Sequence, residues 1–187
     1  MKKIVLTSLC IAAIVYTLWY MHFGSLTDNS GALSTTGLSH PVAFTIWGVL
    51  TFGALYSNIL YAYDEMPNKY KFQNVLFDFA AFGMGFTLVC DFDYSKKTEY
   101  LLHCAGSLTF SVATGICVFM LFLLNYKKSK PFAVFTYIIG AILIIDLILL
   151  IIFKQNALIE TVPVIFALIV LPIMNFTKLF KEKAYAS

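Results

Sequence analysis

The stretch FAVFTYIIGAILIIDLILLIIF, residues 132–153, is almost entirely apolar and contains a single charged residue, Asp146. A helix needs about 20 consecutive apolar residues to cross the hydrocarbon core of a bilayer. Five more stretches meet this condition, at residues 4–23, 42–63, 72–91, 100–126 and 157–176. They lack the strict alternation of barrel strands, and a helix pairs its backbone amides internally. The sequence therefore predicts an all-α polytopic membrane protein with six transmembrane helices.

The composition of the whole chain agrees with this prediction. Of its 187 residues, 60% are hydrophobic and 12% are charged, and the mean hydropathy is +0.82. A soluble domain carries about 25% charged residues. The longest connector, residues 24–41, leaves no room for a second domain. Residues 1–187 are therefore expected to form one six-helix transmembrane domain.

The distribution of lysines predicts the orientation in the membrane. The chain has no arginine, and only Lys96, Lys97 and Lys154 of its 13 basic residues fall on the side away from the N-terminus. Basic residues in short loops collect on the cytoplasmic side. Both termini are therefore expected in the cytoplasm, and the net charge of +3 indicates orientation rather than binding to nucleic acid. The residues on the predicted cytoplasmic side are Lys2, Lys3, Lys69, Lys71, Lys127, Lys128, Lys130, Lys178, Lys181 and Lys183.

Residues 1–23 also have the outline of a signal peptide, because Lys2 and Lys3 precede an apolar run. That run is longer than the roughly 7–15 residues of a signal-peptide core. It ends in Trp19 and Tyr20, so we expect a retained span. The short chain shows no organelle address, which favours a bacterial cytoplasmic membrane as its location.

Several polar side chains fall inside the predicted spans. Asp78 lies about two helical turns into its span, at a depth similar to that of Ser57 and Asn58. A centrally placed Asp costs about 2.5–3.5 kcal/mol on insertion scales, so it usually faces the bundle interior. We therefore expect a polar contact between Asn58 and Asp78. The alternative is an ion or proton site, in which Asp78 and Asp146 would act together in a small ion- or proton-coupled transporter.

The predicted span at residues 100–126 carries a polar stripe at intervals of three and four residues, which places its members on one helical face. Small and hydroxylated residues allow close helix packing, so this face is expected to look inward. Gly83 and Gly85 are expected to allow similar packing in the preceding span. The stripe consists of His103, Gly106, Ser107, Ser111 and Thr114.

All three histidines fall on the predicted outer rim, near acids at the ends of other spans. The candidate ligand-binding residues of an outer-facing polar cavity are His22, His40, Asp91, His103 and Glu160. Three histidines and an Asp can hold a catalytic zinc with an open position for water. The candidate zinc ligands are His22, His40, His103 and Asp91, although no compact metal-binding motif is present. The alternative is a set of interfacial histidines and solvated acids.

Cys90 and Cys104 end one predicted span and begin the next. They would form a disulfide if their Cβ atoms came within about 4.5 Å, and otherwise remain two buried thiols.

One short pattern resembles a family of six-span membrane proteins, the DRAM-like autophagy modulators and their relatives in GPI-lipid remodelling. The residues that carry it are Ser34, Thr35, Thr36 and Gly37 with Pro41 and Phe44, then Phe82-Gly83-Met84-Gly85, then His103, Gly106 and Phe110, with Glu160 near the end. Thr35 stands where that group has Asp, and His40-Pro41-Val42 stands where it has Pro-Glu-Ser. The resemblance covers about half of the chain and implies six helices and a role in handling membrane lipids.

The outer-rim residues are also similar in kind to those of the alkaline ceramidase and adiponectin-receptor group, which assemble Ser, Asp and His around zinc. This chain lacks their His-x-x-x-His element and their seventh span.

Three functions follow from these expectations. The first is a lipid-interacting or lipid-remodelling protein whose partners are membrane lipids. The second is a zinc-dependent hydrolase of lipid amides or esters, and the third is the small transporter.

Overall fold

The computed structural model describes residues 1–66 and 72–180, and this part of the chain is helical apart from its connectors. The elements are α1 (Lys2–Met21), η1 (Asn29–Gly31), α2 (Leu33–Ser39), α3 (Pro41–Asp64), α4 (Phe72–Val89), α5 (Lys97–Leu124), α6 (Lys130–Phe153) and α7 (Ala157–Phe176). Within the described residues, six helices are long and apolar enough to span a membrane. The predicted six-span all-α fold is confirmed.

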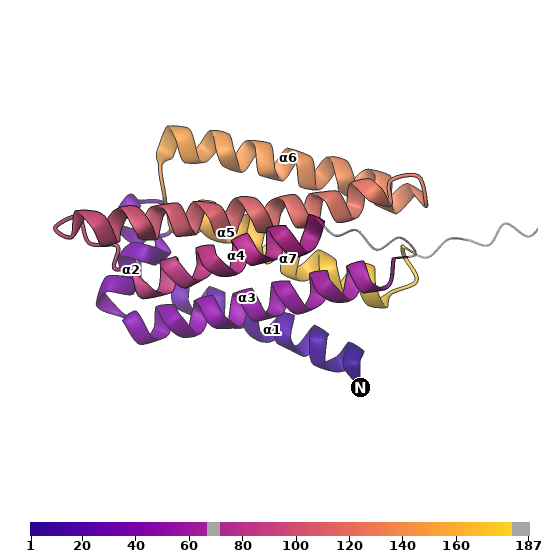
Figure 1. Cartoon of the computed structure of the whole chain (residues 1–187), viewed down its shortest axis with the longest axis horizontal. Helices are drawn as coiled ribbons and strands as arrows, with labels where there is room; N and C mark the ends of the chain where they lie inside the picture. Colours follow the sequence, from indigo (N-terminus) through magenta and orange to yellow (C-terminus); the bar gives the residue numbers. More distant parts are fainter. Residues whose placement is uncertain (67–71, 181–187) are drawn as a thin grey trace, which may run out of the picture.

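The six long helices lie side by side along the long axis of the molecule (Figure 1). The short helix α2 lies at one end of this bundle, which we call the α2 end. The opposite end holds the start of α1, and we call it the Lys2 end. Which end faces the cytoplasm remains a prediction, and four of the lysines behind it, Lys69, Lys71, Lys181 and Lys183, lie outside the described residues.

Helix boundaries follow from local sequence signals. Pro41 occupies the first turn of α3, where its missing N–H leaves no hydrogen bond unmade. Asn156 precedes α7, and its side chain accepts a hydrogen bond from the backbone N–H of Ile159 at 3.0 Å. The predicted spans agree with the helices to within a few residues, and the span at 157–176 coincides with α7. The prediction missed α2, which is too short and too polar to look like a span.

The closest packing in the bundle joins α4 to α5. A Cβ atom added at Gly83 would lie 2.6 Å from the carbonyl oxygen of Gly106, and one added at Gly106 would lie 2.6 Å from that of Gly83. The two backbones therefore touch where these glycines meet, as small residues allow in membrane bundles. Gly85, which we also expected at a close contact, has open space where a Cβ would stand.

The expected contact between Asn58 and Asp78 is wrong. Asn58 is fully buried, and its amide donates to the carbonyl oxygen of Leu6 in α1 at 3.2 Å. The Asn175 amide of α7 donates to the backbone carbonyl of Asn58 at 3.0 Å. Asp78 is exposed, and it lines a groove on the outward face of α4 with Ala81, Phe82, Gly85, Phe86 and Val89. The two residues were matched in depth, but they point in different directions around the bundle.

Helix α6 forms one edge of the bundle (Figure 1). Its buried residues, Phe132, Thr136 and Ile139, all lie in the half nearer the Lys2 end. The half nearer the α2 end is largely exposed; Ile151, for example, keeps 73% of its surface exposed. This half of α6 therefore stands away from the core.

Candidate functional site

Helix α2 is held in place by side chains from three long helices. The Tyr20 hydroxyl of α1 donates to the carbonyl oxygen of Leu33 at 3.0 Å. The backbone N–H of Leu33 donates to Glu160 Oε2 of α7 at 2.7 Å. The side chain of the next residue, Ser34, lies 2.8 Å from His103 Nε2 of α5. His103 and Glu160, two of the predicted site residues, are thus brought together at α2.

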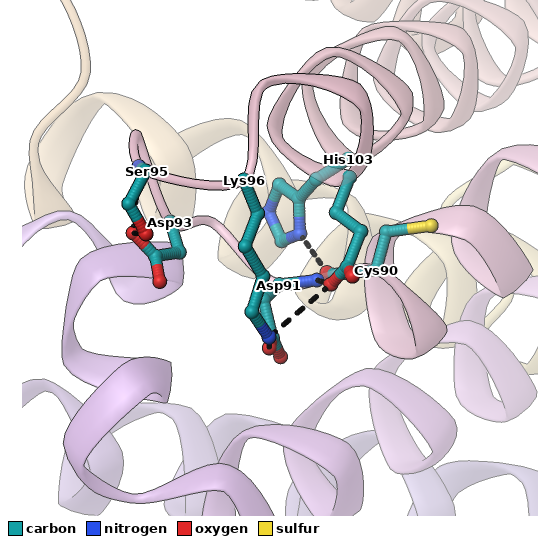
Figure 2. Close-up of polar contacts among 7 residues, drawn as sticks. Cys90, Asp91, Asp93, Ser95, Lys96 and His103 are labelled. Carbon is teal, nitrogen blue, oxygen red and sulfur yellow. Dashed lines mark hydrogen bonds and ion pairs between the residues drawn. The ribbon is translucent and has the colours of Figure 1, made fainter.

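The His103 ring is oriented by a backbone carbonyl. Its Nδ1 atom lies 2.8 Å from the carbonyl oxygen of Cys90, just past the end of α4 (Figure 2). A carbonyl can only accept a hydrogen bond, so Nδ1 carries the proton of this contact. In the neutral ring, Nε2 then has a free lone pair directed at the Ser34 hydroxyl, which donates to it. The ring is 2% exposed and lies between Phe44 and Phe92, whose centroids are 6.0 and 5.2 Å from its own.

Asp91 pairs with a lysine rather than with His103. Lys96 Nζ lies 2.6 Å from Asp91 Oδ2 in the exposed loop before α5 (Figure 2). It also lies 3.6 Å from Glu99 Oε2 in the first turn of α5. The hydrogen bond from Lys96 to Asp91 raises the pKa of Lys96, and the negative charges of Asp91 and Glu99 add to this effect. His103 makes its hydrogen bonds with Ser34 and Cys90 instead.

Asp93 belongs to the same exposed loop. Its Oδ1 atom accepts hydrogen bonds from both the backbone N–H and the hydroxyl of Ser95, each at 2.8 Å. These two bonds lower the pKa of Asp93, the backbone bond contributing most. The loop that carries the Cys90 carbonyl is therefore ordered by its own polar contacts.

The described residues contain no group of three or more His, Cys, Asp or Glu side chains that could hold a metal ion. The structure therefore does not support the zinc hypothesis for His22, His40, His103 and Asp91. Both nitrogens of His103 are occupied, and Asp91 is paired with Lys96. His22 caps α1 and is exposed, while the exposed His40 packs against Phe23 with a centroid distance of 4.5 Å.

A cavity of about 170 Å³ lies among α5, α6 and α7. Three members of the polar stripe of α5 line it, Ser107, Ser111 and Thr114. The predicted inward direction holds for the buried His103 and Gly106, whereas Ser107 and Thr114 are half-buried and Ser111 is exposed. Its remaining polar lining comes from Asp146 of α6, Glu160 of α7 and Gln155 between them. The apolar lining includes Leu55, Phe110, Val118, Ile139, Ile142, Leu143, Leu150, Ile159, Val164 and Phe166.

The cavity and α2 share one residue, Glu160. Its carboxylate accepts the Leu33 N–H, and its side chain also lines the cavity. Asp78 and Asp146, the two acids of the transporter hypothesis, line separate recesses, Asp78 on α4 and Asp146 in the cavity.

The four cysteines are unpaired, so Cys90 and Cys104 form no disulfide.

Two features of this site were not predicted from residue chemistry. Ser34 was noted only through the family resemblance, and neither its hydrogen bond with His103 nor the position of the cavity was expected. His103 is far from Ser34 in the sequence, and nothing in a short helix of small polar residues specifies which side chain it will contact.

Comparison with protein-family models, with curated proteins and with solved structures finds no match to this chain.

Proposed function

We propose that this six-span membrane protein binds a membrane lipid, with the lipid's polar headgroup in the cavity among α5, α6 and α7. The observation that carries the proposal is the cavity itself, which combines an apolar wall with a few convergent polar groups. Sites for small ligands have this composition. The resemblance to the DRAM-like and GPI-lipid-remodelling group implies the same kind of role.

The polar lining favours a headgroup that donates hydrogen bonds. Asp146 and Glu160 contribute carboxyl oxygens, and Ser107, Ser111 and Thr114 contribute hydroxyls. Among the described residues, no lysine lines the cavity. A primary amine fits these groups better than a phosphate monoester, because it offers donors and a positive charge to the two acids. Polar side chains kept at this depth in a membrane are costly unless they have partners, and they commonly mark ligand pathways.

The size of the cavity limits what it can enclose. Its volume of about 170 Å³ is close to that of an engineered cavity of roughly 150 Å³ that binds benzene. It therefore accepts a headgroup fragment, while the acyl chains remain outside. The exposed half of α6 offers an apolar surface for them, with Ile144, Ile148 and Ile151 each at least 48% exposed.

Photo-crosslinking in liposomes tests this proposal. The full chain is reconstituted with a photoactivatable phosphatidylethanolamine or with the matching phosphatidic acid. We expect crosslinks from the amine lipid on α5, α6 and α7, at a several-fold higher yield than from the acid lipid. Asp146→Asn should lower the yield several-fold, because it removes one carboxylate from the lining. Asp78→Asn is the matched control, since Asp78 lies outside the cavity. Equal yields from the two lipids, or a yield that does not depend on Asp146, would contradict the proposal.

A further inference from the structure

The polar contacts at α2 link a serine, a histidine and a group that orients the histidine, the arrangement found in nucleophilic serine sites. The Ser34 hydroxyl lies 2.8 Å from His103 Nε2, and His103 Nδ1 lies 2.8 Å from the Cys90 carbonyl oxygen. In such sites a base takes the proton of the serine, and a third group orients the base. Here the carbonyl of Cys90 fixes the ring in the tautomer whose Nε2 can accept that proton.

We propose that Ser34 is a nucleophile and His103 its general base in the cleavage of a membrane-lipid ester, without a metal ion. This inference rests on the proposed function for delivery of the lipid, because Glu160 joins the cavity to the residue preceding Ser34. It assigns a reaction to a pair of residues that lipid binding alone does not require.

The depth of His103 indicates the class of substrate. Helix α5 runs from Lys97 to Leu124, about 42 Å at 1.5 Å per residue. It therefore exceeds the roughly 30 Å hydrocarbon core by several ångströms at each end. His103 lies about 9 Å from the start of the helix, near the boundary between hydrocarbon and headgroups. Acyl ester bonds of glycerolipids lie at this boundary, whereas the phosphate lies farther out.

The reaction is a balanced hydrolysis. Ser34 Oγ attacks the acyl carbonyl carbon while its proton passes to His103 Nε2. The tetrahedral intermediate collapses, the bond to the lipid alcohol breaks, and the alcohol oxygen takes the proton from Nε2. Water then attacks the acyl-serine with His103 again as the base, which releases the fatty acid and restores the Ser34 hydroxyl. The sum is ester plus water giving acid plus alcohol.

The alternative is that the hydrogen bond only fastens α2 to α5. Ser34 and His103 are 7% and 2% exposed, so both are enclosed by the surrounding helices. A fastening contact needs hydrogen bonding alone, whereas a nucleophile must also react with an electrophile. Covalent labelling therefore separates the two roles.

The test uses the full chain in liposomes with an alkyl fluorophosphonate. In this reaction the Ser34 oxygen–phosphorus bond forms and fluoride leaves. We expect one adduct, located by peptide mass spectrometry at Ser34, and none with Ser34→Ala. His103→Gln should slow labelling at least tenfold, because an amide cannot act as the base. Thr87→Ala is the matched control, since this buried hydroxyl on α4 donates only to the Gly83 carbonyl of its own helix. Labelling that is absent, or that proceeds at the wild-type rate in His103→Gln, overturns the proposal.

Two further measurements keep the test decisive. If Ser34→Ala does not fold, Ser34→Cys replaces it, and its thiol should react with an alkyl iodoacetamide faster than Cys104 does. If the Ser34→Cys thiol reacts no faster than Cys104, His103 does not act as its general base. If the amine lipid crosslinks but no fluorophosphonate adduct forms, Ser34 is not a nucleophile, and the proposed lipid binding still holds. If an adduct forms but the lipid does not crosslink, the cavity does not bind the lipid, and the assignment of Ser34 as a nucleophile still holds.

Discussion

Asn58 links three helices through one buried residue. Its side-chain amide donates to Leu6 of α1, to the Cys10 sulfur at 3.1 Å and to Ala54 of its own helix at 3.0 Å. Asn175 of α7 donates to its backbone carbonyl. In membranes such interhelical hydrogen bonds stabilise by about 0.6 kcal/mol on average and at most about 1.7 kcal/mol. Because Asn58 joins three helices, we expect its stabilising contribution to lie in the upper part of that range.

We therefore expect Asn58→Leu to lower the free energy of unfolding by about 1–2 kcal/mol, because it leaves the Leu6 carbonyl without its donor. Asp78→Asn should change this free energy by less than about 0.5 kcal/mol, since Asp78 is exposed on α4. Unfolding in mixed micelles of increasing SDS content measures both variants. Equal losses in the two would mean that Asn58 has no special role in joining the helices.

The outcome for Asp78 shows what a linear sequence can and cannot specify about a polar residue. Rise per residue fixes its depth, and the helix around Asp78 was predicted correctly. Its direction depends on which face of α4 meets α5, and Gly83 and Gly106 determine that contact. Burial of Gly83 turns Asp78, five residues earlier, toward the outside. The energetic cost of an acid inside a membrane predicted an interior position for Asp78. The close contact at Gly83 instead fixes which face of α4 is buried, and Asp78 lies on the other face.

At the scale of the helices, the α4–α5 contact gives the sharpest comparison. Gly83 and Gly85 are two residues apart on α4, and only Gly83 has another backbone against it. Gly83→Ala should lower the free energy of unfolding by about 1–3 kcal/mol, because the added methyl must push α5 away. Gly85→Ala should leave it unchanged or raise it by up to about 1 kcal/mol through helix propensity. Thermal unfolding in detergent compares the two, and similar melting temperatures would show that the helices are not in close contact there.

Helix α2 explains why part of the site could not be predicted. The polar stripe of α5 and the beginning of α7 were predicted from periodicity and apolar length, and both contribute to the site. The segment before α3 has neither signal. Leu33–Ser39 forms a helix because Glu160, Tyr20 and His103 satisfy its polar groups from outside. A helix stabilised by distant partners leaves little trace in its own sequence.

At the scale of the molecule, the six-span fold follows from the apolar segments, and the lysine distribution predicts the orientation. On a background with the four native cysteines replaced, Lys97→Cys and Lys128→Cys place one thiol near each end of α5. Both positions are exposed. We expect an impermeant maleimide added outside intact cells to label Lys97→Cys and to reach Lys128→Cys only after lysis, because lysine-rich ends stay in the cytoplasm. The reverse pattern would put α2, His103 and Glu160 on the cytoplasmic side.

The position of Glu160 has a consequence for how the protein is made. The N–H of Leu33 pairs with a carboxylate 127 residues later in the chain. At translation rates of about 5–20 residues per second, the ribosome needs roughly 6–25 s to synthesise that interval. Throughout this time the nascent α2 lacks the α7 contact that holds its first turn, although α1 is already present. The site at α2 is therefore completed only after α7 has been inserted. A polypeptide released before Glu160 is synthesised lacks the contact that holds α2, and membrane quality-control proteases can recognise it as incompletely folded.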